Sequence, residues 1–424
     1  MASTTTILGI ILVGIVTVIG GILFLRLHAF VALVLGAIFV GLLTPASSVE
    51  RWSLEKAAVA FQPAAPGEAP QRVDFNGPIN QDTPLQVVRF STQTGHHEPI
   101  GTLAVEESGK SAVFHPEAIG TTIRADDLVV RSSAVATANR LSGQTVGERV
   151  ATGFGSTCAK IGILIALASI VGKCLLDSGA ADRIVRSALG VLGQRGAGGA
   201  FLGSGFLLGI PVFFDTVFYL MIPLGKAMRM RTGGNYLLYV LCIVAGASMA
   251  HSLVPPTPGP LFVAGELGVD LGAMILAGSI VGTFTAGFGY LYASVLNRFR
   301  DLPLRETAEF SLAELETLSQ KDESELPGLW VSLMPIVLPV VLISGLTVVN
   351  TFQLQLPKTV HSTLETLGNK NIALLLSAGI ALATVAWQKR TSLKELGGAI
   401  EQSLASGGVI ILITAGGGAF GQVL

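Results

Sequence analysis

The sequence predicts an all-α polytopic membrane protein with broken or re-entrant helices, a two-repeat architecture and a small β-rich insert outside the membrane. Composition is the first reason: half of the 424 residues are hydrophobic and 13% are charged, whereas soluble domains carry about 25% charged residues. Long stretches without a charged residue are the second reason. The third is that glycine and proline interrupt those stretches, where an ordinary spanning helix would continue.

Stretches without Asp, Glu, Lys or Arg are the candidates for membrane-spanning helices. A spanning helix needs about 20 mainly apolar residues, and all but the shortest of these stretches approach or exceed that length. They are residues 2–25, 27–49, 232–265, 271–297, 328–357, 371–388 and 402–424. The first is no cleavable signal, because it lacks a basic start and a second apolar stretch follows Arg26. Buried helices of a large soluble protein, the alternative, do not explain so many stretches of this length.

A polar segment over 46–147 is predicted to be a soluble, β-rich insert. It contains proline-marked turns and short stretches in which apolar and polar residues alternate, a pattern typical of strands with one buried face. The turns lie near Pro63, Pro66 and Pro70, and the alternating stretches are Leu85–Phe90, Gly101–Glu106 and Asp127–Arg131.

The remaining chain divides around a second polar segment. Residues 1–45 are expected to form the first two transmembrane helices, 148–296 the core of a first transport repeat with broken helices, and 328–424 the start of a second repeat. Between them, 297–327 are expected to form an acidic polar loop, in which Phe310–Leu318 suits a short amphipathic helix.

A loose internal repeat supports this division. A displacement of 249 residues aligns Gly153–Leu175 with Gln402–Leu424. Glycine-interrupted apolar segments that recur in two halves of a chain point to the binding site of a secondary transporter. The first copy continues beyond the position equivalent to Leu424, so the second repeat is expected to be truncated there.

Basic residues in short loops set the expected orientation, because they tend to remain on the cytoplasmic side. Two clusters should face the cytoplasm: Arg183, Arg186 and Arg195, and Lys226, Arg229 and Arg231. Arg26, in the first tight turn, would place the N-terminus and the insert outside.

Two places interrupt the apolar pattern most strongly, Gly209–Asp215 and His251–Pro260. Prolines in the second place cannot continue a helix, because each lacks an amide donor and clashes with the preceding turn. Both breaks lie between apolar segments, so they are expected inside or at the mouth of the membrane domain, lining a cavity. An ordinary loop is the alternative for the prolines. Around Pro211 the chain could form either one broken span or a re-entrant hairpin.

Asp215 and His251 are the ionisable residues within these breaks, and they predict a proton-coupling site. A carboxylate in the apolar part of a bilayer is costly and usually marks an ion or proton pathway. A neutral imidazole is a natural proton carrier near neutral pH. The alternatives are structural, because Asp215 can cap the helix that follows it and His251 can pack among backbone carbonyls.

Other functional classes find little support in the sequence. The net charge of −1 offers no basic surface for nucleic acid, and the three cysteines lie in apolar stretches without a disulfide pattern. The glycine tracts at 153–157 and 416–418 lack the features of a nucleotide-binding loop. Ser248 and His251 are not accompanied by an oxyanion motif, and no metal-binding motif occurs. We therefore predict no enzyme, metal site or cofactor.

Four blocks of the sequence resemble the gluconate permease family, bacterial proton symporters within the wider ion transporter superfamily. The blocks are Gly153–Ala180, Gly209–Asp215, His251–Pro260 and Ala415–Leu424, of which the proline block is the most specific. The resemblance covers 145–424 well and 1–45 loosely, whereas the 46–147 insert departs from the family. It implies proton-coupled uptake of gluconate or a related hydroxylated monocarboxylate by a multi-pass protein of the bacterial cytoplasmic (inner) membrane.

This resemblance also implies a binding site. Backbone amides at the ends of broken helices would hold the carboxylate, and hydroxyl side chains would bind the sugar hydroxyls. The expected substrate-binding residues are Gly155, Ser156, Thr157, Ser178, Gly179, Phe214, Thr257, Gly259 and Gly417. Asp215 is expected to carry the proton, with His251 as the second candidate. The expected partners are a small sugar acid, a proton and the lipid bilayer. Sodium in place of the proton and a homo-oligomer stay open.

Two other functions stay open from the sequence alone. The transporter could carry another organic anion, such as lactate, a C4-dicarboxylate or citrate. A dicarboxylate would need a second anchor, for which Lys160 and Lys173 are the bases inside apolar stretches. The protein could also be a membrane sensor that works through the 46–147 insert.

Overall fold

The computed structural model describes residues 4–63, 71–77, 79–80, 83–91, 93–300, 302–303, 326–390 and 392–423. The chain divides into two compact units, Met1–Gly155 with Gly416–Leu424, and Ser156–Ala415. Two long helices, α5 (Val146–Asp177) and α16 (Leu393–Val423), contribute to both units. The turns predicted at Pro66 and Pro70 and the helix predicted over Phe310–Leu318 lie outside the described residues.

In unit 1, α1 (Thr4–Leu23) and α2 (Ala29–Leu43) are the two apolar helices expected over 1–45, and they pack against each other. Glycine permits the close approach, since a Cβ on Gly36 would lie 2.6 Å from Cγ2 of Val18. Large apolar side chains on both helices are exposed, as expected of surfaces that face lipid. At its end α2 bends by 101° into α3 (Ala46–Ala57), where the polar insert begins.

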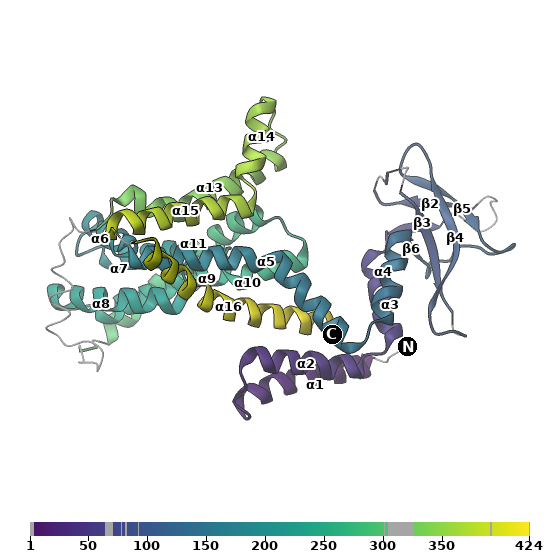
Figure 1. The fold of residues 1–424 in the computed structure, drawn as a ribbon, viewed down its shortest axis with the longest axis horizontal. Helices are drawn as coiled ribbons and strands as arrows, with labels where there is room; N and C mark the ends of the chain where they lie inside the picture. The colour runs from purple at the N-terminus through teal and green to yellow at the C-terminus, as the bar shows by residue number, and fades with distance from the viewer. Residues whose placement is uncertain are drawn as a thin grey trace. The chain divides into compact units, whose positions relative to one another are not determined.

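The insert is built on a six-stranded antiparallel sheet with the strand order β1-β2-β5-β4-β3-β6 (Figure 1). The strands are β1 (Phe61–Pro63), β2 (Arg72–Phe75), β3 (Leu85–Phe90), β4 (His97–Val105), β5 (Ser111–Pro116) and β6 (Leu128–Arg131). One face packs through Val88 and Val130 on Leu54 of α3 and Ala138 of α4 (Ser132–Gly143). The other face forms its own core around Val87. The β-rich insert is therefore confirmed, with a helix added before and after the sheet.

The side chain of Glu50 links α3 to this sheet by hydrogen bonding. Its buried carboxylate accepts a hydrogen bond of 2.7 Å from the backbone amide of His97 and lies 2.5 Å from Nδ1 of His96. Burial lowers the pKa of the His97 imidazole, and the charge of Glu50 opposes that shift. The contact joins the first helix of the insert to the start of β4.

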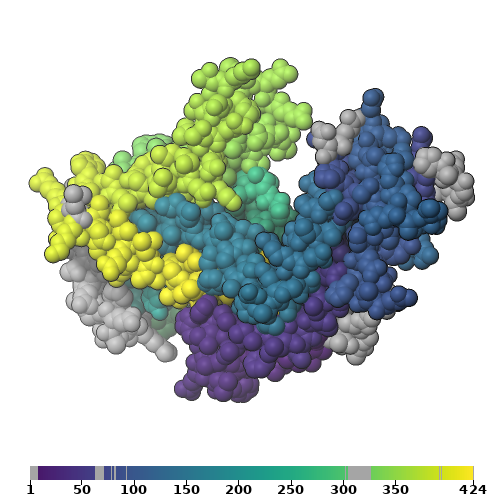
Figure 2. All heavy atoms as spheres, turned by 45° about the vertical axis from the view of Figure 1, so that its right-hand side comes forward, coloured from purple at the N-terminus to yellow at the C-terminus, as the bar shows by residue number. Residues whose placement is uncertain are grey.

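Among the described residues, six helices are long and apolar enough to cross a membrane, or seven if α2 and α3 form one bent span. The six are α5, α9 (Tyr236–Leu253) with α10 (Pro258–Leu267), α11 (Leu271–Phe299), α13 (Leu329–Thr351), α15 (Lys370–Lys389) and α16. Shorter helices α6 (Ala180–Leu192) and α14 (Lys358–Leu367) connect them. None of the α14 side chains is buried, and the helix projects from unit 2 in both views (Figures 1 and 2). The predicted polytopic helical class is confirmed.

The first break forms a re-entrant hairpin of α7 (Ala197–Leu208) and α8 (Phe214–Thr232). Both helices of the hairpin pack against the same part of α9, since Gly205 of α7 and Gly225 of α8 lie against Ile243. Gly198, near the start of α7, and Thr232, at the end of α8, line one cavity. The basic clusters on either side of the hairpin therefore lie at the same end of unit 2, which decides between the two topologies left open by the sequence.

The second break interrupts a span and not a loop. The segment between α9 and α10 is buried, with Val254 fully inaccessible and Thr257 3% exposed. The helices on its two sides together make one candidate span, Tyr236–Leu267. Gly278 of α11 lies directly against the carbonyl oxygen of Leu253, so α11 closes on the backbone at the point where α9 ends.

The two helices aligned by the internal repeat cross each other in antiparallel orientation. Gly162 of α5 lies 3.9 Å, measured from an added Cβ, from Ile411 of α16, and these two positions are equivalent under the displacement of 249 residues. Further along, Ser169 of α5 meets Gly407 of α16, so the residue numbers run in opposite directions. Contact between equivalent residues of antiparallel helices is the geometry that an inverted repeat produces.

Candidate functional site

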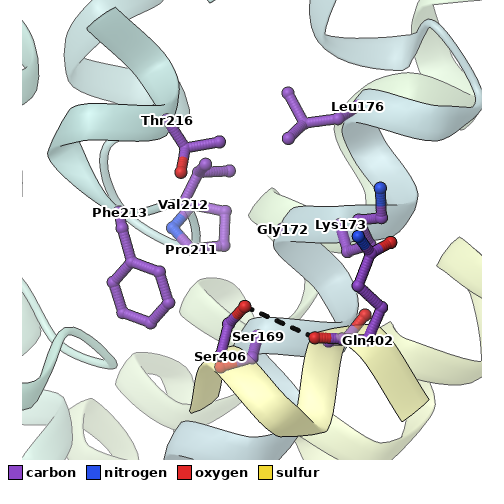
Figure 3. A pocket seen from close by; sticks show the side chains of 11 residues that line it. Ser169, Gly172, Lys173, Leu176, Pro211, Val212, Phe213, Thr216, Gln402 and Ser406 are labelled. Atoms are coloured by element: carbon purple, nitrogen blue, oxygen red, sulfur yellow. Dashed lines mark hydrogen bonds between the residues drawn. The ribbon is translucent and has the colours of Figure 1, made fainter. Parts of the chain in front are cut away.

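A polar cavity of about 260 Å³ lies between α5, the tip of the α7–α8 hairpin and α16, all within unit 2. Its lining residues are Ser169, Gly172, Lys173, Leu176, Pro211, Val212, Phe213, Thr216, Gln402, Ser403 and Ser406. Figure 3 shows Lys173 and Gln402 together on one side and Pro211, Val212 and Thr216 on the other. The volume lies below the about 300–1,000 Å³ of cavities that hold drug-sized molecules, so it suits a small ligand.

The hairpin tip forms one wall because its backbone comes very close to α5. An added Cβ on Gly172 would lie 3.3 Å from the carbonyl oxygen of Pro211, so a larger residue there would push the tip away. After the tip, α8 begins with Phe213 as its N-cap, and no side chain caps its first turn. The free amides of a helix N-terminus carry partial positive charge and attract anions. Thr216 of this turn lines the cavity.

Lys173 is the one charged residue among the described residues that line the cavity. Its Nζ lies 3.0 Å from Oδ1 of Asp177, one helical turn further along α5, and the two side chains are 31% and 25% exposed. A half-buried ammonium group on one side of the cavity and an uncapped helix N-terminus on the other supply hydrogen-bond donors suited to a carboxylate.

Three serines of α5 and α16 present hydroxyl oxygens to the cavity as acceptors. Ser169 donates its hydroxyl proton to the carbonyl of Ile165 at 2.8 Å, and Ser403 donates to Ala399 at 2.7 Å. Ser406 donates to the carbonyl of Gln402 at 3.3 Å (Figure 3). Each hydroxyl proton is therefore used within a helix, and the oxygen keeps its lone pairs for donors that enter the cavity.

The two proline-marked breaks meet behind this cavity. Pro211 of the first break and Pro255 and Pro256 of the second line a crevice together with Pro335 and Pro339 of α13. The crevice measures about 10 Å³, at the lower limit of the volume that holds one water molecule, and its lining is apolar. The two breaks therefore pack tightly against each other at this crevice. The first break also borders the polar cavity, through Pro211.

Asp215 and His251 lie beside the cavity and not in its lining. Asp215 is exposed in the first turn of α8, and Thr216 donates a hydrogen bond of 3.4 Å to it. Phe213 lines the cavity and makes an edge-on contact of 6.1 Å with the ring of His251. The buried Nδ1 of His251 has no hydrogen-bond partner among the described residues, and Asp215 is near enough to interact with this imidazole electrostatically.

The other predicted residues of the two breaks and the α5–α6 turn serve local structure in unit 2. Ser178 donates to the carbonyl of Cys174 at 2.7 Å, and Gly179 adopts a left-handed φ of 77° at the start of α6. Thr257 is buried and donates to the carbonyl of Val254 at 2.7 Å. Gly259 is exposed in α10, and Phe214 stacks on Phe218 at 5.9 Å. None of these predicted residues lines the cavity.

The predicted residues of the glycine tracts lie elsewhere on the two long helices. Gly155 and Gly417 belong to unit 1, and neither has a neighbour within 4 Å of an added Cβ. Ser156 is half-buried and Thr157 is fully buried, both within α5 in unit 2. The structure therefore does not bring these four residues into the lining of the cavity.

Six polar lining residues were absent from the predicted site: Ser169, Lys173, Thr216, Gln402, Ser403 and Ser406. Only Lys173 carries a sequence signal, as a base inside an apolar stretch. The rest are single polar residues that meet only because α5 crosses α16 and because the hairpin tip packs beside that crossing. Among the described residues, no group of three or more His, Cys, Asp or Glu is arranged to hold a metal ion.

Comparison with known proteins gives a consistent set of relatives. A sequence model of the GntP family permeases matches residues 126–424. An uncharacterized permease of Haemophilus influenzae is 33% identical over 70% of this chain and 62% of its own length. A gluconate permease of Pseudomonas aeruginosa is 33% identical over 64% of this chain and 59% of its own.

A third relative, the Gnt-II system L-idonate transporter of Escherichia coli, is 30% identical over 70% of this chain and 66% of its own length. The chain spans less than two thirds of the length of each of these relatives. No solved structure matches it.

Proposed function

The chain belongs to the GntP family of permeases, and on that premise we propose that the whole protein takes up gluconate or a related sugar acid by proton symport. The family match confirms the resemblance carried by the sequence motifs. The relatives are named as permeases and transporters, not enzymes, and the chain is a multi-pass protein of the bacterial inner membrane.

The observation that carries the proposal is that the cavity combines hydrogen-bond donors for a carboxylate with hydroxyl acceptors for sugar hydroxyls. The donors are the Lys173 ammonium group, the amides of the first turn of α8 and the side-chain amide of Gln402. They match the two oxygens of a carboxylate, which accepts hydrogen bonds and carries the negative charge.

The acceptors are the oxygens of Ser169, Ser403 and Ser406, whose protons are used within their helices. A polyhydroxylated acid presents hydroxyl donors to such oxygens along its length. A lactate offers one hydroxyl, and a dicarboxylate would place a second negative charge against acceptors. The cavity therefore favours a sugar acid over these other organic anions.

For the coupled proton, we retain Asp215 and His251 as the proposed route to the cavity. Asp215 lies in the first turn of α8, and the ring of Phe213, which lines the cavity, contacts the ring of His251 on α9. An intramembrane imidazole whose Nδ1 has no hydrogen-bond partner in the described part of the chain, with a carboxylate nearby, is typical of a proton pathway.

A binding screen with the full protein in detergent tests the proposed function. Gluconate and idonate should raise the melting temperature, because a ligand held by the folded state stabilises it by about 2.7 kcal/mol at 100 times its Kd. Lactate, succinate, citrate and neutral glucose are the comparisons. Stabilisation by one of the other anions, with none by either sugar acid, would contradict the assignment of substrate class.

A further inference from the structure

The cation of the cavity already has a carboxylate partner. Nζ of Lys173 lies 3.0 Å from Oδ1 of Asp177, and both side chains remain partly exposed. Lys173 lines the cavity, whereas Asp177 lies one turn behind it towards the end of α5. A substrate carboxylate that enters the cavity must therefore compete with Asp177 for the same ammonium group.

Binding of a substrate carboxylate would leave a net negative charge beside Lys173 and Asp177. Lys173 and Asp177 together are neutral, and a bound carboxylate adds one negative charge. An uncompensated charge in a partly desolvated site is costly, and two carboxylates that share one cation repel each other. Cys174, buried between the two, interacts electrostatically with both but adds no positive charge. One proton restores neutrality.

We propose that Lys173 and Asp177 form an exchange pair that couples substrate to proton, an inference that rests on the proposed function. The substrate carboxylate replaces Asp177 on Lys173, which stays charged. The released carboxylate of Asp177 takes a proton, forming one O–H bond and becoming a neutral acid. When the substrate leaves, the proton dissociates and Asp177 returns to Lys173. Asp215 and His251 then deliver the proton, and Asp177 holds it.

Proton uptake by the unmodified protein tests this exchange directly. The full protein in weakly buffered detergent at pH 7.5, with a pH-indicator dye, should take up about one proton for each gluconate that binds. Asp177→Asn should still bind gluconate and take up no proton. Gluconate binding by the unmodified protein without proton uptake would overturn the proposal, whatever the fate of the variants.

Transport in liposomes gives the second readout. With a pH gradient of one unit, one proton per substrate supports about tenfold accumulation of labelled gluconate. Asp177→Asn should exchange labelled for unlabelled gluconate without a gradient, yet reach an accumulation ratio of one. Asp177→Glu keeps the carboxylate and should retain coupling. Asp182→Asn is the matched control, because Asp182 forms the same one-turn ion pair on α6 with Arg186, a base that, unlike Lys173, does not line the cavity.

The outcomes of these two experiments distinguish failure of the exchange pair from failure of the proposed function. If Asp177→Asn still accumulates gluconate like the unmodified protein, the exchange pair is wrong. It is also wrong if folded Asp177→Asn has lost gluconate exchange, because Asp177 would then be needed for binding. If the unmodified protein shows no gluconate exchange at all, the substrate assignment fails first and the exchange pair falls with it.

Discussion

Replacing Lys173 by methionine should weaken gluconate binding about thirtyfold while leaving the protein folded. Methionine keeps the length and apolar stem of lysine but removes the single charge among the described lining residues of the cavity. Loss of a charged partner from a hydrogen-bonded pair costs about 2–5 kcal/mol. Because the Lys173 side chain is partly exposed, we expect the lower end, which weakens Kd about thirtyfold. Titration calorimetry of the purified full protein measures the change.

Lys160→Met is the matched control for this prediction. Lys160 lies on the same helix and also forms an ion pair, with Nζ 2.9 Å from Oε1 of Glu266, but it lines a different cavity. Its loss should leave gluconate affinity within about twofold of the original, since surface ion pairs contribute about 0–1 kcal/mol. Equal effects of the two substitutions, or gluconate affinity unchanged by Lys173→Met, would contradict the assignment of Lys173 to the substrate carboxylate.

Gly246→Ala should strongly destabilise the membrane domain. Gly246 lies where α9 crosses α7, and an added Cβ would overlap the carbonyl oxygen of Leu202 and approach the amide of Phe206 to 2.9 Å. Both atoms belong to the backbone, so no side chain can move aside. Overpacking costs about 1–3 kcal/mol, and α7 would have to shift, displacing the hairpin tip. We expect a lower melting temperature together with weaker gluconate binding.

Gly203→Ala on α7 serves as the control for Gly246→Ala. Gly203 is exposed, and an added Cβ meets nothing within 4 Å. Alanine is favoured over glycine in a helix by about 1 kcal/mol, so this substitution should be neutral or stabilising. A melting temperature for Gly246→Ala equal to that for Gly203→Ala would show that the α7–α9 contact is looser than the structure indicates.

The sequence predicts the spanning helices and the breaks because both depend on local properties. A helix in lipid must be apolar along its length, and a proline ends a helix wherever it lies. The strand Leu85–Phe90 and the breaks at Pro211 and Pro255 therefore lie where the sequence places them. The sequence does not decide between a hairpin and a single broken span at Pro211. That choice depends on where along α9 the helices α7 and α8 pack.

The polar lining of the cavity could not be predicted in the same way. Gln402 and Ser406 reach Lys173 and Ser169 only because α16 crosses α5 in antiparallel orientation at Gly407. A single glutamine or serine in an apolar helix has no pattern that identifies its partner on a helix more than 200 residues away. The sequence-based prediction placed part of the site in the glycine tracts instead, because glycine clusters are recognisable in a sequence, although helix packing needs them as often as ligand binding does.

Cysteine protection at Ser406 tests most directly whether the broken hairpin forms a water-filled cavity that holds a sugar acid. Ser406→Cys is introduced after replacement of Cys158, Cys174 and Cys242, the free cysteines among the described residues. Ser362→Cys on α14, where no side chain is buried, is the reference. A small water-soluble methanethiosulfonate should label both variants. Gluconate at ten times its Kd should slow labelling of Ser406→Cys about tenfold and leave Ser362→Cys unchanged. Labelling of Ser406→Cys that gluconate does not slow, or no labelling there at all, would contradict the account.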